Sequence, residues 1–133
     1  MNILVDSCVF LDVLTNDPQW ADWSAGQIDH LAGEHRLCIN PLIYAEISIG
    51  FTRIEELEDA LPGDLVARLS LPWEAAFLAG KCFLKYRKGG GMRRSPLPDF
   101  YIGAHAAIGG MTLLTRDPSR YRTHFPRLPL ICP

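Results

Sequence analysis

Short apolar runs alternate along this chain with segments of helical character, and this alternation is the strongest constraint on its fold. The runs are β-rich and contain few polar residues, which is typical of strands buried on both faces of a sheet. Strands separated by helices usually pair in parallel through right-handed crossovers. We therefore predict an α/β fold with a mostly parallel sheet of four to five strands covered on both faces. The predicted strands are 2–6, 36–40, 66–72, 111–115 and 128–133.

The intervening segments contain no interdomain linker and no internal repeat. At 133 residues, the chain is long enough for one hydrophobic core, so we predict a single domain over residues 1–133. We expect residues 89–98, GGGMRRSPLP, to form a flexible loop and residues 116–126 to form an irregular connection. The predicted helices cover 7–14, 23–35, the segment from Pro41 through Glu46, 52–61, 73–88 and 99–110.

The formal net charge of −2 conceals opposite charge balances in two parts of the chain. Residues 1–78 contain three basic and thirteen acidic residues, a balance of −10, whereas residues 79–133 contain ten basic and two acidic residues, a balance of +8. A positively charged surface of this kind suits a polyanion, although a solvated charged face is the commoner explanation of any single run. The two acids of the basic part, Asp99 and Asp117, are therefore of interest as site residues.

The remaining composition excludes several classes of protein. The four cysteines are spread without a CxxC pair, which predicts neither a zinc site nor a dense disulfide framework. The chain begins MNILVDSCVF, without a basic leader, and no apolar run approaches the roughly 20 residues needed to span a bilayer. We expect reduced thiols, a cytoplasmic location and no membrane partner.

Four acidic residues lie near the ends of strands where parallel sheets bind their ligands. Asp6 ends the first predicted strand, Glu46 lies on the helix after the second, and Asp99 and Asp117 lie on either side of the fourth. Three of them also have simpler explanations, because Asp6 and Asp99 could cap helices and Asp117 precedes Pro118 in a common turn. Taken together, the four acids predict one shared site.

Glu46 has no such simple explanation. In a helix, its neighbours one turn away on either side are apolar or lack a side chain. An ionised carboxylate in these surroundings costs on the order of several kcal/mol unless a cation meets it. The sequence therefore predicts a cationic partner for Glu46, either a metal ion or a basic residue from elsewhere in the chain. The neighbours are Leu42, Ile43, Ile49 and Gly50.

The four carboxylates indicate a particular kind of metal site. Carboxylates without an intervening base repel one another, which raises their pKa values unless a cation is present. Oxygen ligands without a His or Cys cluster favour Mg²⁺ or Mn²⁺, which bind through carboxylates and substrate phosphates. Such an ion activates water and stabilises the charge that develops when a phosphodiester is attacked. We predict metal-dependent phosphodiester hydrolysis, with these metal-binding and catalytic residues: Asp6, Glu46, Asp99 and Asp117.

Basic side chains gather before Asp99 and lead into the glycine-rich loop, with no acid among them. Phosphate backbones bind such surfaces through electrostatic attraction and counterion release. The nearby aromatic residues Tyr86, Phe100 and Tyr101 fit core packing better than base stacking. The predicted backbone-binding residues are Lys85, Arg87, Lys88, Arg93, Arg94 and Arg116.

Four motifs resemble, in order and spacing, those of PIN-domain ribonucleases: ILVDSCVFLD, PLIYAEISIG, LPDFYIGAHA and TLLTRDPSRY. The short single-domain form resembles the VapC toxins of type II VapBC toxin–antitoxin systems. This resemblance implies a three-layer α/β/α sandwich, Mg²⁺- or Mn²⁺-dependent endoribonuclease activity on RNA, a homodimer and a cognate VapB-type antitoxin. The family's acidic metal-binding quartet falls on the four acids already named.

In the family, hydroxyl side chains support the acidic cluster. The resemblance assigns this supporting role to Ser7 and Thr115, although Ser7 could equally provide an N-cap hydroxyl. The basic loop is less uniform in the family, so its substrate role rests on charge alone.

Two other functions stay open at this point. One is a non-catalytic PIN-like module that only binds RNA, and the other is a metal-dependent nuclease that acts on DNA. A phosphorylated receiver domain is disfavoured, because Asp6 is followed by SCVF rather than by an acid and no Lys occurs after Lys88.

Overall fold

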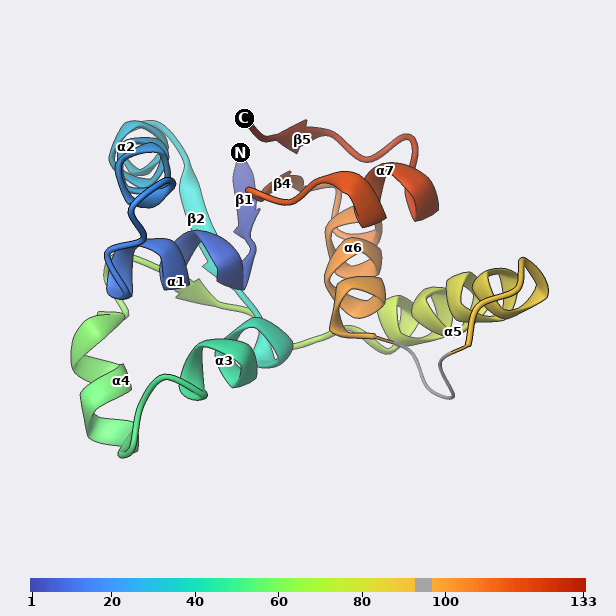
Figure 1. Cartoon of the computed structure of the whole chain (residues 1–133), viewed down its shortest axis with the longest axis horizontal. Coiled ribbons are helices and arrows are strands. Elements are labelled where there is room, and N and C mark those ends of the chain that lie inside the picture. The colour runs from blue at the N-terminus through green and yellow to red at the C-terminus, as the bar shows by residue number, and fades with distance from the viewer. Residues whose placement is uncertain (93–96) are drawn as a thin grey trace.

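A five-stranded parallel sheet with β1 at its centre forms the middle layer of the molecule (Figure 1). The computed structural model describes residues 1–92 and 97–133. The strand order is β3-β2-β1-β4-β5, and all neighbouring strands are parallel. The predicted α/β class is confirmed, with the larger of the two expected strand numbers. The strands are β1 (Asn2–Val5), β2 (Arg36–Ile39), β3 (Ala67–Arg68), β4 (Thr112–Leu114) and β5 (Leu130–Ile131).

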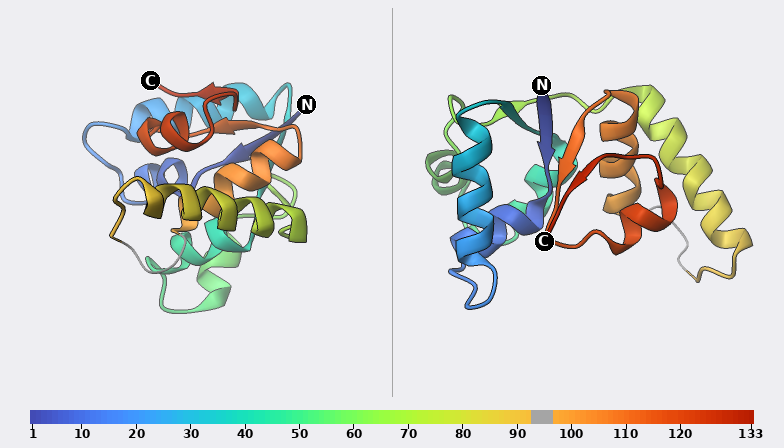
Figure 2. Two further views of the ribbon diagram at one scale, coloured as in Figure 1. Left: turned by 90° about the vertical axis from the view of Figure 1, so that its right-hand side faces the viewer. Right: turned by 90° about the horizontal axis from the view of Figure 1, so that it is seen from above.

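Helices cover both faces of this sheet and complete an α/β/α sandwich. The helices that precede β3 gather on one side, and those that follow β3 gather on the other (Figures 1 and 2). Across the described ranges, no helix combines the length and apolar character needed to cross a bilayer. The helices are α1 (Ser7–Leu14), α2 (Ala21–Ala32), α3 (Pro41–Ser48), α4 (Ile54–Ala60), α5 (Trp73–Lys88), α6 (Pro98–Ile108) and α7 (Ser119–His124).

The central strand explains where a site can form. Leu4 of β1 pairs in register with Cys38 of β2 on one side and with Leu113 of β4 on the other. All three residues have fully buried side chains, because helices cover both faces. The chain leaves β1 toward one edge of the sheet and returns on its other side as β4. The carboxyl ends of β1 and β4 therefore flank a topological switch point, where open parallel sheets bind ligands.

The prediction of an irregular connection over residues 116–126 is wrong, because this segment contains α7. The helix begins after Pro118, whose carbonyl accepts the N–H of Arg122 at 2.9 Å. Tyr121 is the buried residue of this helix and is 1% exposed. One buried residue within a short polar helix gives no hydrophobic periodicity, so the sequence pattern did not reveal it.

The third strand, predicted over residues 66–72, is limited to Ala67–Arg68. It is an edge strand, and Leu69 makes one further backbone hydrogen bond, 2.9 Å, to the carbonyl of Ile39. Pro72, which has no N–H to donate, then precedes α5. The strand is therefore shorter than its apolar sequence suggests.

Candidate functional site

Four different segments bring the predicted acids to the carboxyl end of the sheet. Asp6 directly follows β1, and Asp117 lies beyond the end of β4 (Figure 1). Glu46 lies on α3, which begins after β2, and Asp99 lies in the first turn of α6. The topology of the sheet therefore places all four acids at the edge that the sequence predicted.

Asp6 has hydrogen-bond donors on both carboxylate oxygens and is 6% exposed. Its Oδ1 accepts the N–H of Ser7 at 2.8 Å, so Asp6 is the N-cap of α1. Its Oδ2 accepts the hydroxyl of Thr115 at 2.9 Å and the hydroxyl of Tyr121 at 3.0 Å. The capping explanation is thus correct but incomplete, because the second oxygen is held by residues that follow β4.

Glu46 is half-buried and is met by a hydroxyl group. The Ser7 hydroxyl donates to Oε1 of Glu46 at 2.9 Å, which joins the first residue of α1 to α3. Within residues 1–92 and 97–133, no Lys, Arg or His side chain forms an ion pair with Glu46. Asn40 determines where α3 starts, since its side chain accepts the N–H of Ile43 at 3.0 Å as the N-cap.

Asp99 does not cap α6, because Leu97 occupies the N-cap position and Pro98 follows it. Two consecutive residues of α7 face its carboxylate instead. The Tyr121 hydroxyl lies 3.4 Å from Oδ1, and Nη1 of Arg120 lies 3.5 Å from Oδ2. The capping explanation of Asp99 is therefore wrong, and the carboxylate is directed toward α7.

Thr115 connects Asp6 to the fourth acid. The backbone N–H of Asp117 donates to the Thr115 hydroxyl at 3.1 Å, while this hydroxyl donates to Asp6. The side chain of Asp117 is more open, and its Oδ1 accepts the Ser119 hydroxyl at 3.4 Å. A turn at Asp117 and a place beside the other acids are therefore compatible.

The charges of these carboxylates act on one another. Burial raises the pKa of Asp6, and Asp99 raises it further, although hydrogen bonds to hydroxyl groups oppose the shift. Burial also raises the pKa of Glu46, and both Asp6 and Asp99 add to the effect. Burial raises the pKa of Asp99 as well, and Asp117 adds to that shift. Ionisation of one carboxylate therefore opposes ionisation of its neighbours.

The donor chemistry of the site fits Mg²⁺ or Mn²⁺, because the four acids offer only carboxylate oxygens. The nearby thiol of Cys8 stays protonated at neutral pH, since burial raises its pKa to about 11. As they stand, no three His, Cys, Asp or Glu side chains in the described part of the chain are grouped closely enough to hold an ion. The carboxylates are thus spaced more widely than in a closed metal site.

Sequence reasoning missed Tyr121 and also missed the pairing of Arg120 with Asp99, both of which reach the acids from α7. Both residues lie in the segment that was expected to be irregular. No local pattern indicated these contacts, because one buried residue in a short polar helix gives no hydrophobic periodicity.

Sequence reasoning also missed Asp12, which binds Arg116. The Nε and Nη2 atoms of Arg116 each lie 3.0 Å from one carboxylate oxygen of Asp12. Asp12 is 3% exposed and also accepts the Ser24 hydroxyl at 2.8 Å. The guanidinium lies 5.8 Å from the ring centroid of Trp20. The predicted binding of nucleic acid by Arg116 stays a prediction, and two of its five N–H donors already bind Asp12.

The other basic candidates lie near the end of α5. Lys85, Arg87 and Lys88 occupy its last turn and have exposed side chains. Their binding of a nucleic-acid backbone stays a prediction. Arg93 and Arg94 lie outside the described residues.

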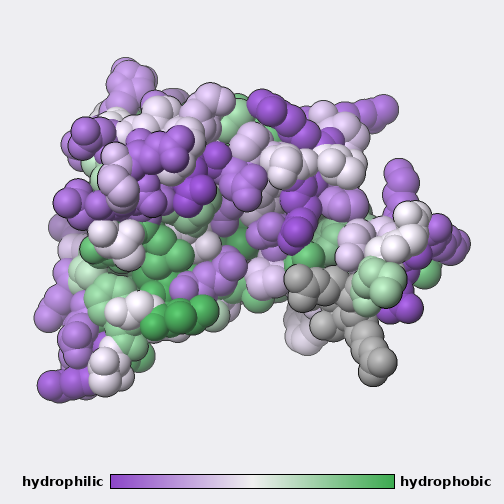
Figure 3. All heavy atoms as spheres, in the orientation of Figure 1, coloured by the Kyte–Doolittle hydropathy of each residue, from purple (hydrophilic) through white to green (hydrophobic). Residues whose placement is uncertain are grey.

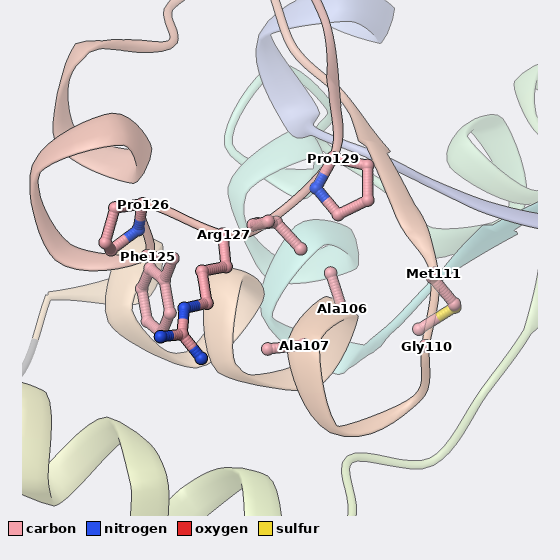
Figure 4. Close-up of a pocket in the computed structure, with 9 residues that line it drawn as sticks. Ala106, Ala107, Gly110, Met111, Phe125, Pro126, Arg127 and Pro129 are labelled. Carbon is pink, nitrogen blue, oxygen red and sulfur yellow. The ribbon is translucent and has the colours of Figure 1, made fainter.

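An apolar pocket of about 380 Å³ lies apart from the acids, at the other end of α6 (Figure 4). Ala106 and Ala107 of α6 form one wall, and the segment from Phe125 to Pro129 forms the other. Ala107 is eight residues along the helix from Asp99, or about 12 Å along its axis. The pocket has no acidic lining residue, so it does not contribute to the carboxylate site.

Comparison with known families now adds to this geometry. A model of the PIN domain matches residues 3–126. This chain belongs to the PIN-domain family. The match includes all four acids described above, as well as Tyr121. A comparison with curated proteins finds no match.

Several solved structures are similar to this PIN domain, and one of them is a toxin–antitoxin complex from Klebsiella pneumoniae. A chain of VapBC2 from Rickettsia felis, bound to a promoter DNA fragment, gives a TM-score of 0.76 at 18% identity over 99% of this chain and 98% of that chain. A chain of VapBC-1 from nontypeable Haemophilus influenzae gives a TM-score of 0.74 at 20% identity over 99% of this chain and 98% of that chain. A chain of FitAcB from Neisseria gonorrhoeae gives a TM-score of 0.71 at 20% identity over 97% of this chain and 96% of that chain. At these identities, the likeness establishes the fold.

Proposed function

We propose that this protein is a VapC-type toxin, an endoribonuclease that depends on Mg²⁺ or Mn²⁺ and is neutralised by a cognate antitoxin. The observation that carries the proposal is the convergence of four carboxylates from separate segments at the switch point of the sheet. Members of the PIN family are typically nucleases, and they generally use divalent metals. In this proposal, residues 1–133 form one PIN domain.

In this proposed mechanism, different neighbouring residues orient the acids. Asp6, Glu46, Asp99 and Asp117 would hold the metal, which when bound supplies a Lewis acid that activates water and neutralises charge on the phosphate. Ser7 donates its hydroxyl to Glu46 and its N–H to Asp6, which fixes the relative orientation of these two ligands.

The residues that follow β4 act from the opposite side. Thr115 orients Asp6 through its hydroxyl and accepts the N–H of Asp117, so one side chain sets the positions of two ligands. Arg120 partly neutralises Asp99 while the carboxylates are without a metal. Because its guanidinium lies at the edge of the site, Arg120 is also placed to attract a phosphate group.

Partners are the second part of the proposal. The similar structures are toxin–antitoxin complexes, which supports an antitoxin partner for this chain. The chain also exposes apolar side chains, and Figure 3 shows a hydrophobic area over α1, α3 and α4. Exposed apolar areas are typical of surfaces that bind protein. We further propose a homodimer, which light scattering of the purified protein tests directly. The exposed residues include Val13, Leu14, Ile49 and Ile54.

Cleavage of total RNA by purified, antitoxin-free protein tests the proposed activity. We expect discrete products with Mg²⁺ or Mn²⁺, none with EDTA, and none from Glu46→Gln or Asp99→Asn. Calorimetric titration of the same samples with Mn²⁺ shows whether the variants fail to bind metal or fail only to cut.

Each alternative function predicts a different result. An RNA-binding module would bind RNA without cutting it, and Asp99→Asn would retain or strengthen that binding. A DNA nuclease would cut DNA and leave RNA intact. Absence of metal binding together with intact RNA would overturn the proposed function.

A further inference from the structure

A groove lies between α5 and α7, the helix from which Arg120 pairs with Asp99. Its volume is about 450 Å³, and both helices contribute to its lining. This volume falls within the range of roughly 300–1,000 Å³ that is typical of small-ligand sites. None of the lining residues is acidic. They are Cys82, Lys85, Tyr86, Gly89, Thr123 and His124.

The floor of the groove is aromatic and well supported. The His124 ring lies 4.8 Å from the buried Phe100 ring and 6.0 Å from the Tyr86 ring, measured between centroids. Tyr86 stacks on Phe83 at 6.0 Å with an interplanar angle of 27°. A Cβ atom at Gly91 would collide with the Tyr86 ring, so the backbone after α5 holds this ring in place. Partly exposed rings held in this way provide a surface for a nucleobase.

The charge of the groove is positive and is continuous with the acidic site. Burial lowers the pKa of His124, and the positive charges of Arg120 and Lys85 lower it further. Lys85 lines the groove together with His124, and Arg120 precedes His124 by one turn of α7. Arg120 also pairs with Asp99 at 3.5 Å, so α7 lines the groove through His124 and reaches the carboxylates through Arg120.

We propose that the α5–α7 groove binds one nucleotide of a single-stranded RNA, adjacent to the phosphodiester that is cut at the acids. The inference rests on the proposed function for the identity of the polymer. In this arrangement, Lys85 contacts a backbone phosphate and the rings of Tyr86 and His124 contact the base. Cation and aromatic surfaces placed side by side are the combination that single strands require.

Lysine substitutions on α5 test this inference with a matched control. Lys85→Gln removes the charge that lines the groove, whereas Lys81→Gln removes a charge from the same helix outside it, where Lys81 lies 5.0 Å from the Phe77 ring. We would measure binding of a fluorescent single-stranded RNA 12-mer by anisotropy, in EDTA, over a series of salt concentrations. For Lys85→Gln, we expect weaker binding and a salt slope smaller by about 0.7, the value of one phosphate contact to a single strand. For Lys81→Gln, we expect the wild-type slope.

Alkylation of Cys82 provides a second readout that does not depend on a variant. Cys82 lines the groove, and Cys132 lies elsewhere, near Arg122. RNA should slow the modification of Cys82 by iodoacetamide several-fold, and modification of Cys132 should keep its rate. Equal slopes for the two lysine variants with unprotected Cys82 would overturn the inference while RNA cleavage still supported the proposed function. If the 12-mer does not bind at all, the inference is overturned, and the cleavage assay with total RNA decides the proposed function separately.

Discussion

The phenolic hydroxyl of Tyr121 donates a 3.0 Å hydrogen bond to Oδ2 of Asp6, across 115 residues of sequence. The Tyr121 hydroxyl oxygen also lies 3.4 Å from Oδ1 of Asp99, so a neutral hydroxyl group lies between two carboxylates. Burial raises the pKa of Tyr121 well above its ordinary value, and the charges of Asp6 and Asp99 add to the effect, so the hydroxyl keeps its proton and remains a donor. Tyr121 thereby ties α7 to the end of β1.

Tyr121→Phe should destabilise the metal-free protein. The ring still packs, but a buried carboxylate oxygen loses a donor, which costs about 1–2 kcal/mol. Urea unfolding in EDTA measures the change. Tyr44→Phe is the matched control, because it removes a hydroxyl that contacts an exposed Glu58 at 3.2 Å, and we expect a much smaller loss. Equal losses in the two variants would contradict a structural role for the Tyr121 hydroxyl.

Asp12→Asn should also destabilise the protein, by about 2 kcal/mol, since it leaves a largely buried guanidinium without its counter-charge. The Arg116 side chain is 30% exposed, and hydration of its guanidinium therefore limits the loss of stability. Glu58→Gln breaks the exposed ion pair with Arg68 and should cost far less. Thermal unfolding of both variants provides the comparison, and a larger effect from Glu58→Gln would argue against this ranking.

Glu46→Gln should raise the melting temperature in EDTA. The change removes a half-buried charge that Asp6 and Asp99 repel, and the amide keeps an oxygen for the Ser7 hydroxyl. With Mn²⁺ in excess, the wild type should gain stability through metal binding and the variant should gain less, which reverses their order. Glu34→Gln, which alters an exposed residue after α2, controls for net charge. An equal Mn²⁺ effect on wild type and Glu46→Gln would exclude Glu46 as a ligand.

His105 should make the protein less stable as the pH falls. Asn40 caps α3 through its Oδ1, so its Nδ2 donates to Nδ1 of His105 at 3.0 Å, and a proton on Nδ1 would break this contact. Burial lowers the pKa of His105 in the folded state. The stabilisation that neutral His105 provides is therefore fully present above about pH 6.5, the ordinary pKa of histidine. It is lost as the pH falls through this pKa, because the unfolded state takes up the proton first.

The variant His105→Gln should flatten this dependence. The free energy of unfolding, measured between pH 8 and pH 5.5, should fall less steeply for the variant than for the wild type. The exposed His30 provides the control, and His30→Gln should keep the wild-type slope. An unchanged slope in His105→Gln would show that other groups set the acid response.

The sequence was sufficient to locate the acids because their positions follow from backbone topology. Alternating strands and helices predict a parallel sheet, and parallel strands end at one edge, so Asp6 and Asp117 had to approach each other. Glu46 was identified by a local conflict, a carboxylate with apolar neighbours. Its contact with Ser7, 39 residues away, satisfies part of that conflict with a hydroxyl group rather than the cation we expected.

The contacts between side chains were harder to predict from the sequence. Asp12 and Arg116 are 104 residues apart, and nothing local distinguishes them from other surface charges. Tyr121 belongs to a six-residue helix whose stability depends on packing rather than on its own sequence. Such pairings depend on the directions of side chains in the assembled fold.

The pairing of β1 with β4 also determines when the acidic site can form in a newly made chain. Asp6 is synthesised 109 residues before Thr115 and 115 residues before Tyr121, the two residues whose hydroxyl groups it accepts. A fragment that stops before residue 112 has no β4 to lie beside β1, and its first acid has neither hydroxyl donor. The acidic site therefore forms only after residues 112–121 have been synthesised, and fragments that stop before them lack it.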